Sequence, residues 1–239
     1  LKDIDAKKLY EYYKKMISIC KIDIFVSGNI DSKVEEILVE NENIKKLQGR
    51  TSQVKFEIPK KEKVKEQEIV EQMDVTQGKI VIGMDLTQEN AEQKYDAIVY
   101  NAILGGTANS KMFQEVREKA SLAYSAGSTY LRYKGNILIK CGIEIKNYEK
   151  ALEIIRTQLE DMRNGKFSDE DIENAKKSII SGIRSIDDEQ DTEITYFFGQ
   201  ELTGEKTLTE EYIRSIEKVT KEGIIKIANS LQINTIYFL

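Results

Sequence analysis

The chain has 239 residues, of which 40% are hydrophobic and 32% are charged, a balance typical of a globular protein large enough to bury a core. Its 36 Lys and Arg residues against 41 Asp and Glu residues give a net charge of −5, which offers no basic surface to nucleic acid or to an anionic membrane. Histidine is absent, so this chain by itself provides neither a histidine-ligated zinc site nor a Ser-His-Asp triad.

Hydropathy and cysteine usage indicate in which cellular compartment the chain is expected. No apolar run approaches the roughly 20 residues that cross a bilayer, and the opening Leu1-Lys2-Asp3 does not begin a signal peptide. Cys20 and Cys141 each lie among apolar, strand-like residues, which predicts two buried, reduced thiols and no disulfide. We therefore expect a soluble, cytoplasmic chain without a membrane or nucleic acid as partner.

The opening segment has the pattern of helix, strand, turn and helix. A helix is predicted over residues 4–17, with Asp5 as its N-cap. Residues 22–26 alternate as a strand, and Asp31 begins a second helix that ends near Val39.

A polar, charged stretch follows and holds the only proline, Pro59. Such a stretch is typical of a linker, which we place at residues 51–65. The closing helix and strand of the chain have the same plan as the opening ones at an offset of about 215 residues, which indicates an internal repeat. The sequence therefore predicts the end of a first half-domain over residues 1–50 and a complete second half-domain over residues 66–239.

Two strands are predicted after the linker, over residues 68–74 and 79–86. The turn V-T-Q-G-K joins them, and we expect Gly78 to take the positive φ that other residues resist. The second strand reads K-I-V-I-G-M-D-L, and its apolar run predicts a central position in a sheet.

The stretch from Leu104 to Tyr130 predicts a corner between a helix and a strand. A helix over residues 91–104 is closed by the glycine turn of Gly105 and Gly106. A further helix ends near Lys119, and a strand begins directly after it. Residues 122–133 and 136–145 predict paired strands around Lys134-Gly135, so the corner leads into a sheet.

The C-terminal part is mainly helical. A helix over residues 148–163 ends at Gly165, and Ser168 with Asp171 resembles a capping box that opens a long helix with an apolar stripe. That stripe is predicted to be core and comprises Ile172, Ala175, Ile179, Ile183 and Ile186. Shorter helices and a final strand follow, over residues 194–202, 210–216, 221–230 and 234–239.

The glycine turn does not predict nucleotide binding. The run G-G-T-A-N-S-K lacks the glycine that precedes the lysine of a phosphate loop, and a helix rather than a strand comes before it. No CxxC pair, inverted zinc motif or calcium-loop spacing is present either. These classes of site are excluded within the chain.

What remains is a pair of side chains seven residues apart, Arg117 and Tyr124. Arg offers a planar fork of donors to a carbonyl or carboxylate, and the Tyr hydroxyl can donate to a developing oxyanion. Taken alone, an Arg and a Tyr near a corner are more often structural than functional.

The pattern L-G-G-x-x-x-S-x-x-F-x-x-V-R-E-K-x-x-L-A-Y resembles the signature of the second half-domain of the pitrilysin/insulinase family of zinc peptidases, which includes mitochondrial processing peptidase. The resemblance extends through G-K-F-S-D-E-D to the closing T-I-Y-F-L. It implies an α+β fold with a mostly antiparallel sheet and helices packed on it. It also implies a parent built from two homologous halves that close around an unfolded peptide.

In that family the first half carries the zinc motif, and the second half contributes an Arg-Tyr pair that matches Arg117 and Tyr124. The resemblance therefore implies substrate binding and transition-state support by these two residues, beside the glycine turn of Gly105 and Gly106. Zinc is expected in the parent or in a partner and not in this chain, which alone is expected to be inactive. The expected partners are a peptide substrate, the missing N-terminal half-domain, and a family member in a homodimer or heterodimer.

The motif departs from many active members, which have glycine where this chain has Ser121. The ending resembles short bacterial members in which one partner often has a degraded zinc motif. Our main reading of the parent is an active zinc metallopeptidase that cleaves peptides or unfolded protein segments, and the alternative is a non-catalytic subunit that pairs with an active one. A structural scaffold and a peptide-binding module that uses an exposed sheet edge are further alternatives.

Overall fold

The computed structural model describes residues 4–51, 64–86 and 93–239. Its contacts divide the chain into two compact units, Leu1–Glu57 with Ser185–Lys206, and Ile58–Arg184 with Thr207–Leu239. The expected linker falls mostly on residues 52–63, which lie outside the described ones, so the predicted half-domain boundary stays a prediction.

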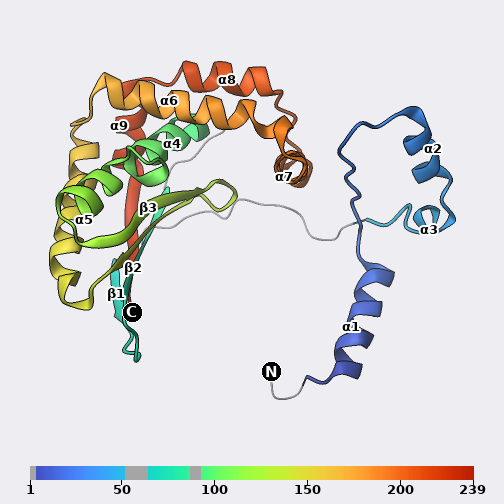
Figure 1. The fold of residues 1–239 in the computed structure, drawn as a ribbon, viewed down its shortest axis with the longest axis horizontal. Coiled ribbons are helices and arrows are strands. Elements are labelled where there is room, and N and C mark those ends of the chain that lie inside the picture. Colours follow the sequence, from blue (N-terminus) through green and yellow to red (C-terminus); the bar gives the residue numbers. More distant parts are fainter. Residues whose placement is uncertain (1–3, 52–63, 87–92) are drawn as a thin grey trace. The chain divides into compact units, whose positions relative to one another are not determined.

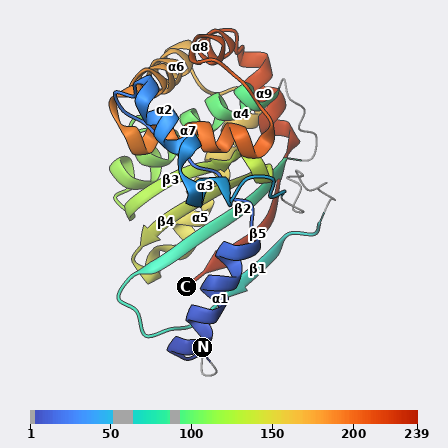
Figure 2. The same cartoon turned by 90° about the vertical axis from the view of Figure 1, so that its right-hand side faces the viewer.

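The larger unit is built on a five-stranded sheet in the order β1-β5-β2-β4-β3 (Figures 1 and 2). Three of its four strand pairs are antiparallel, and β1 with β5 is the parallel one. The predicted mostly antiparallel sheet is therefore confirmed, as is the central place of β2. The strands are β1 (Gln67–Val70), β2 (Gly78–Leu86), β3 (Ala123–Leu131), β4 (Asn136–Ile143) and β5 (Leu231–Phe238).

Helices of the same unit pack on one side of this sheet (Figure 1). The long ones are α5 (Tyr148–Arg163) and α6 (Asp169–Arg184), and the shorter ones are α4 (Gln93–Asn101), α8 (Thr209–Glu217) and α9 (Lys221–Ser230). The α5 and α9 bounds agree with the predicted helices. The predicted start of the α4 helix at residue 91 lies outside the described residues.

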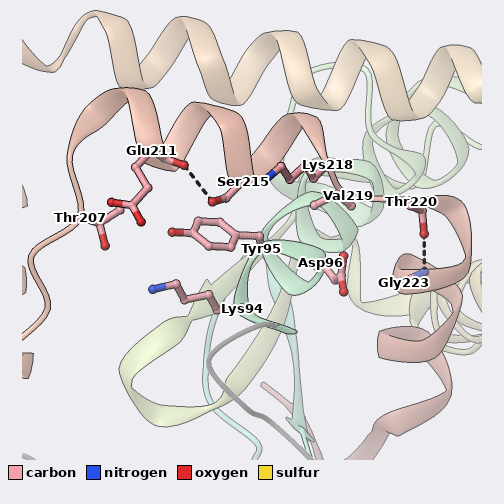
Figure 3. Close-up of a pocket in the computed structure, with 10 residues that line it drawn as sticks. All are labelled: Lys94, Tyr95, Asp96, Thr207, Glu211, Ser215, Lys218, Val219, Thr220 and Gly223. Carbon is pink, nitrogen blue, oxygen red and sulfur yellow. Dashed lines mark hydrogen bonds between the residues drawn. The ribbon is translucent and has the colours of Figure 1, made fainter.

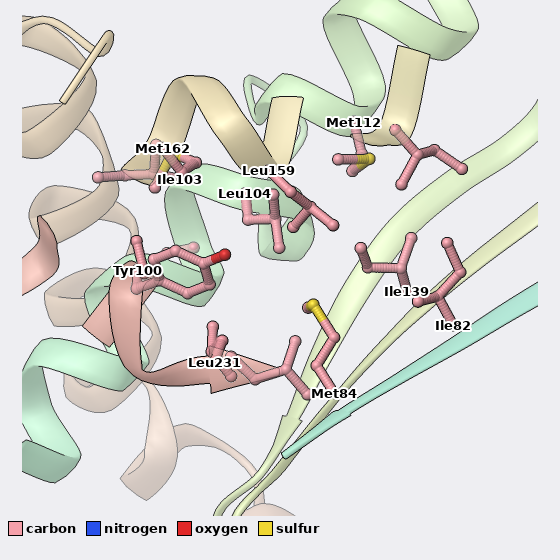
Figure 4. Packing of buried hydrophobic residues seen from close by; sticks show 14 of the residues in the cluster. Ile82, Met84, Tyr100, Ile103, Leu104, Met112, Ile139, Leu159, Met162 and Leu231 are labelled. Atoms are coloured by element: carbon pink, nitrogen blue, oxygen red, sulfur yellow. The ribbon is translucent and has the colours of Figure 1, made fainter. Parts of the chain in front are cut away.

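One apolar core fills the space between sheet and helices (Figure 4). Ile82 and Ile139 enter it from β2 and β4, and Tyr100, Leu104 and Met162 meet them from the helical side. All five are essentially inaccessible to solvent, and burial of each such side chain stabilises the fold by about 1.5–3 kcal/mol. The stripe predicted for α6 is confirmed as core up to Ile183, with Ile172 and Ala175 buried and Ile179 and Ile183 partly buried against the same cluster. The predicted last member, Ile186, lies beyond the end of α6 in the smaller unit and is not part of this cluster.

Local hydrogen bonds define the ends of these helices. The predicted capping box is present: Ser168 N donates to Asp171 Oδ2 at 2.8 Å, and Asp171 N donates to Ser168 Oγ at 3.1 Å. Gly165, after α5, has a φ of +68°, which glycine adopts without the steric cost of a side chain. Thr220 caps α9 by accepting from Gly223 N.

The predicted pairing of the first two strands is wrong. β1 lies parallel to β5 at one edge of the sheet, and β2 is separated from it by β5, so no hairpin joins them. The expectation of a positive φ at Gly78 is wrong too, since Gly78 is the first residue of β2 and is not among the positive-φ glycines. A Cβ there would lie 2.9 Å from the Phe238 ring, so the ring's close approach accounts for glycine at this position.

The smaller unit contains α1 (Ala6–Ile19), α2 (Ser32–Glu40), α3 (Glu42–Lys45), η5 (Ile186–Asp188) and α7 (Gln190–Thr203). Asp5 and Asp31 cap the first two helices as predicted, each accepting backbone hydrogen bonds. The strand predicted over residues 22–26 is wrong, because no strand forms there. The segment packs on α7 instead: the Phe25 ring meets Phe198 edge-on at 5.8 Å, and Ser27 donates to Glu193.

The two cysteines have different surroundings. Cys141 is 2% exposed in β4, and burial raises the pKa of its thiol to about 12, whereas Cys20 is exposed, against the expectation of two buried thiols. A thiol-disulfide reagent at pH 8 is therefore expected to label one thiol per native chain and two per chain in denaturant, because only a thiolate reacts. Labelling of both thiols at equal rates in the native protein would contradict this burial.

Candidate functional site

The corner predicted from the sequence contains two π-helical segments. The first, η1, spans Ala102–Gly106 and ends with the two glycines of the predicted turn, and the second, η2, spans Met112–Lys119. The wide turns continue past η2, where Ala120 N donates to Glu115 O at 3.2 Å and Leu122 N donates to Val116 O at 3.1 Å. π-Helical turns are rare and occur often at functional sites, so this corner has an unusual backbone where function was expected.

Glycine is required in this turn because the backbone of η1 lies directly on β3. A Cβ at Gly105 would lie 2.6 Å from Ser128 Oγ and 2.8 Å from the carbonyl carbon of Gly127. At Gly106 a Cβ would lie 2.8 Å from Asn101 Nδ2. The predicted glycine turn therefore serves close packing against the strand that carries Tyr124.

Arg117 lies in the last turn of η2 with its side chain 45% exposed. Its guanidinium stacks over the Phe113 ring at 4.7 Å, and its Nε lies 3.6 Å from Glu118 Oε1. Exposed contacts of this kind each contribute little to the stability of the fold, about 1 kcal/mol or less. They orient the side chain and leave most of its donors open to solvent.

Tyr124 is 66% exposed and lies at an irregularity in the sheet. The register between β3 and β4 passes from Ala123 opposite Ile143 to Ser125 opposite Gly142, so Tyr124 is the extra residue of a β-bulge. A bulge re-aims the side chain that it carries, and bulges are frequent beside active sites. Tyr124 is thus turned out of the regular alternation of the strand.

A charged pair lies beside Tyr124. Lys146 Nζ is 2.8 Å from Glu144 Oε2, and the hydrogen bond between them is the main cause of a raised pKa of the lysine. The nearby Tyr124 phenol raises the Lys146 pKa further. This neighbour could not be predicted from the sequence, because Lys146 follows the next strand and joins the corner only through the pairing of β3 with β4.

The structure therefore places Arg117 and Tyr124 on adjacent elements with both side chains exposed. No hydrogen bond or ring contact joins the two within the described part of the chain. Neither is buried against the core, which would have excluded a binding role. Their action on a substrate remains a proposal.

Ser121, between η2 and β3, has a φ of +53° and is the single non-glycine residue with positive φ in the described ranges. Glycine adopts this left-handed backbone without the steric cost of a side chain, which would explain the glycine that the family resemblance leads one to expect at this position. Replacing Ser121 with glycine is expected to raise the free energy of unfolding by roughly 1 kcal/mol, because the steric cost outweighs the added freedom of the unfolded chain.

The matched control is Ala120→Gly, since Ala120 has an ordinary φ of −83°. That variant is expected to lower the free energy of unfolding by about 0.5–1 kcal/mol. Urea unfolding monitored by circular dichroism measures both. Destabilisation by both variants to the same degree would show that the backbone of Ser121 is not strained.

In the part of the chain that the structure describes, no group of three or more His, Cys, Asp or Glu side chains is placed to bind a metal ion. Of the helices described, none is both long and apolar enough to span a membrane.

The comparisons with known proteins agree with this geometry. Residues 3–179 match the family described as "Peptidase M16 inactive domain". The chain belongs to the peptidase M16 family. The resemblance predicted from the stretch of Leu104 to Tyr130 is therefore confirmed, and the chain matches the part of these zinc-protease-like proteins that is described as inactive.

Relatives in Bacillus subtilis illustrate the family. The chain is 36% identical over 238 residues to the "Probable inactive metalloprotease YmfF", covering 99% of this chain and 55% of that protein. It is 24% identical over 168 residues to the "Uncharacterized zinc protease YmxG", covering 69% of this chain and 41% of that protein. The chain thus spans about half the length of the curated relatives it matches.

A solved structure supports the M16 fold. A conserved protein from Enterococcus faecalis V583 matches with a TM-score of 0.78 and 28% identity, over 99% of this chain and 56% of the other. This likeness supports the fold and carries no information on the role of Arg117 or Tyr124.

Proposed function

We propose that this chain is the peptide-binding half of an M16 protein and that Arg117 and Tyr124 contact the bound peptide. The observation that carries the proposal is the exposure of both side chains at one corner, where a π-helical segment and a β-bulge aim them outward. Met112 and Val116 of the same π-helical segment are buried in the core, whereas Arg117 and Tyr124 are exposed and take no part in it.

The two side chains suit the groups of a peptide backbone. The guanidinium presents several donors in one plane and can bind a peptide carbonyl or a terminal carboxylate through two parallel hydrogen bonds. The phenol adds one donor that meets an oxygen on the same backbone. Together they bind an extended peptide without reading its side chains.

The free edge of β3 supports binding of an extended segment. β3 pairs only with β4 within the described sheet and so forms its edge over nine residues, A-Y-S-A-G-S-T-Y-L, none of which is charged. Long edge strands usually carry charges or proline that prevent further pairing. An unprotected edge beside Tyr124 favours a peptide added as a further strand.

The family's zinc does not fit this chain. Histidine is absent from the sequence, and the described residues form no cluster of metal ligands. In our proposal the zinc belongs to the N-terminal half of the parent or to a partner M16 protein. The similarity to a probable inactive metalloprotease favours a non-catalytic parent that pairs with an active family member.

Hydrogen exchange on the full-length protein tests the proposal. Addition of an unfolded peptide is expected to slow exchange of the β3 edge amides and to leave β1, the opposite edge, unchanged. Zinc analysis of the same sample distinguishes the two kinds of parent, with about one zinc per chain for an active peptidase and none for a non-catalytic subunit. Peptide binding without protection of β3 would refute this mode of binding.

A further inference from the structure

A cavity on the helical side of the larger unit is separate from the proposed peptide site. It has a volume of about 720 Å³ and lies between α4, the end of α8 and the start of α9 (Figure 3). This volume is within the range of small-ligand pockets, roughly 300–1,000 Å³. None of the lining residues belongs to η2 or β3.

Tyr95 lies in the middle of the cavity in Figure 3. Its ring is fixed from behind by an edge-on contact with Tyr212, with 5.2 Å between centroids. The surrounding hydroxyls have their own roles: Ser215 donates to Glu211 O at 2.8 Å, and Thr220 accepts from Gly223 N at 3.2 Å. Lys94 Nζ lies over the Tyr95 ring at 5.0 Å from its centroid. The lining therefore combines an aromatic ring with polar groups around it.

The charges that line the cavity balance. Lys94 and Glu211 lie to one side of Tyr95, and Lys218 and Asp96 lie on the other (Figure 3). Two cations against two anions give no net positive charge to hold a phosphate or nucleotide. No metal-binding cluster is found in the described residues, so a bound metal ion does not explain the carboxylates.

Asp96 is a partly buried charge in this lining. Burial raises the pKa of its carboxyl, and the nearby Lys226 only partly opposes this. Its carboxylate lies against the first turn of α9, where a Cβ on Gly223 would come within 2.6 Å of Asp96 Oδ1. No hydrogen bond or ion pair to Asp96 forms among residues that the structure describes, nor does Lys218 form an ion pair there.

We propose that this cavity binds a free amino acid or dipeptide with an apolar side chain. The ligand's ammonium group contacts Asp96, its carboxylate contacts Lys218, and its side chain lies on the Tyr95 ring. A zwitterion supplies both missing partners at once and adds no net charge to a balanced site. The site does not depend on Arg117 or Tyr124, and the class of ligand is the one that peptide hydrolysis releases.

Calorimetric titration of the full-length protein with phenylalanine and with alanyl-phenylalanine tests the site. Binding of either zwitterion is expected, and the tighter one identifies the ligand class. N-acetylated and C-amidated forms are expected to bind at least about 10-fold more weakly, since each loses one charged contact. Equal binding of blocked and free forms, or no binding of any, would overturn the proposal.

Asp96→Asn and Lys218→Ala are each expected to weaken binding about 10-fold or more. Lys166→Ala serves as the control, because Lys166 pairs with Asp161 outside the cavity and should leave affinity unchanged. Since Asp96 packs on α9, the far-UV circular dichroism and melting temperature of Asp96→Asn are compared with wild type. If that variant unfolds, the test uses Ser215→Trp in its place. The indole fills the cavity from the surface of α8, so this variant should abolish binding of the zwitterion.

Discussion

Replacing Arg117 with alanine in the full-length protein is expected to weaken binding of an unfolded peptide by about 10- to 100-fold. A hydrogen bond between a charged group and a peptide oxygen contributes about 1.5–3 kcal/mol, and alanine removes the whole guanidinium. Stability should change little, because the side chain is half exposed and makes only surface contacts. Fluorescence anisotropy with a labelled peptide measures the loss.

Lys119→Ala is the matched control, since Lys119 lies at the end of the same segment and pairs with Glu115 at 2.7 Å. It removes one positive charge from η2 and should change peptide affinity less than 3-fold. Tyr124→Phe is expected to weaken binding by a few-fold, as it deletes one neutral hydrogen bond. Equal losses from Arg117→Ala and Lys119→Ala would show that net charge, and not the Arg117 donors, holds the peptide.

Gly105→Ala is expected to lower the free energy of unfolding by roughly 2–3 kcal/mol. The added methyl group would meet the main chain of Gly127 and Ser128, which cannot rotate away as a side chain does. The helical preference of alanine offsets only about 1 kcal/mol of this cost. Peptide binding should fall as well, because η1 and η2 must shift away from β3.

The control substitution is Gly182→Ala in α6, where a Cβ meets no atom within 4 Å. It is expected to raise the free energy of unfolding by about 0.5–1 kcal/mol, as alanine favours the helix. Urea denaturation of the two variants gives the comparison. If Gly105→Ala is as stable as wild type, the close packing of the glycine turn on β3 is not real.

Features determined by neighbouring residues were predictable from the sequence. The Ser168–Asp171 capping box, the Asp5 and Asp31 caps and the apolar stripe of α6 depend on spacings of three or four residues, which the sequence displays directly. Strand order was not predictable, because β1 pairs with β5 across most of the chain. The alternation at residues 22–26 predicted a strand that has no pairing partner in the described ranges.

In the candidate site too, the features set by neighbouring residues were predictable and those set by long-range pairing were not. The corner carrying Arg117 and Tyr124 was predicted from a motif within one continuous stretch. The bulge at Tyr124 and the approach of Lys146 depend on the register with β4, which no local pattern indicates. The cavity around Tyr95 was missed for the same reason, since its lining comes from α4, α8 and α9.

Site-specific photocrosslinking tests the central claim most directly. A benzophenone amino acid is placed at position 124 of the full-length protein, and at the exposed Arg214 of α8 as control, before a biotinylated unfolded peptide is added. The account predicts a peptide crosslink from position 124, reduced about 10-fold or more by Arg117→Ala, and none from position 214. Equal crosslinking from both positions, or none from position 124 while the peptide is bound, would contradict it.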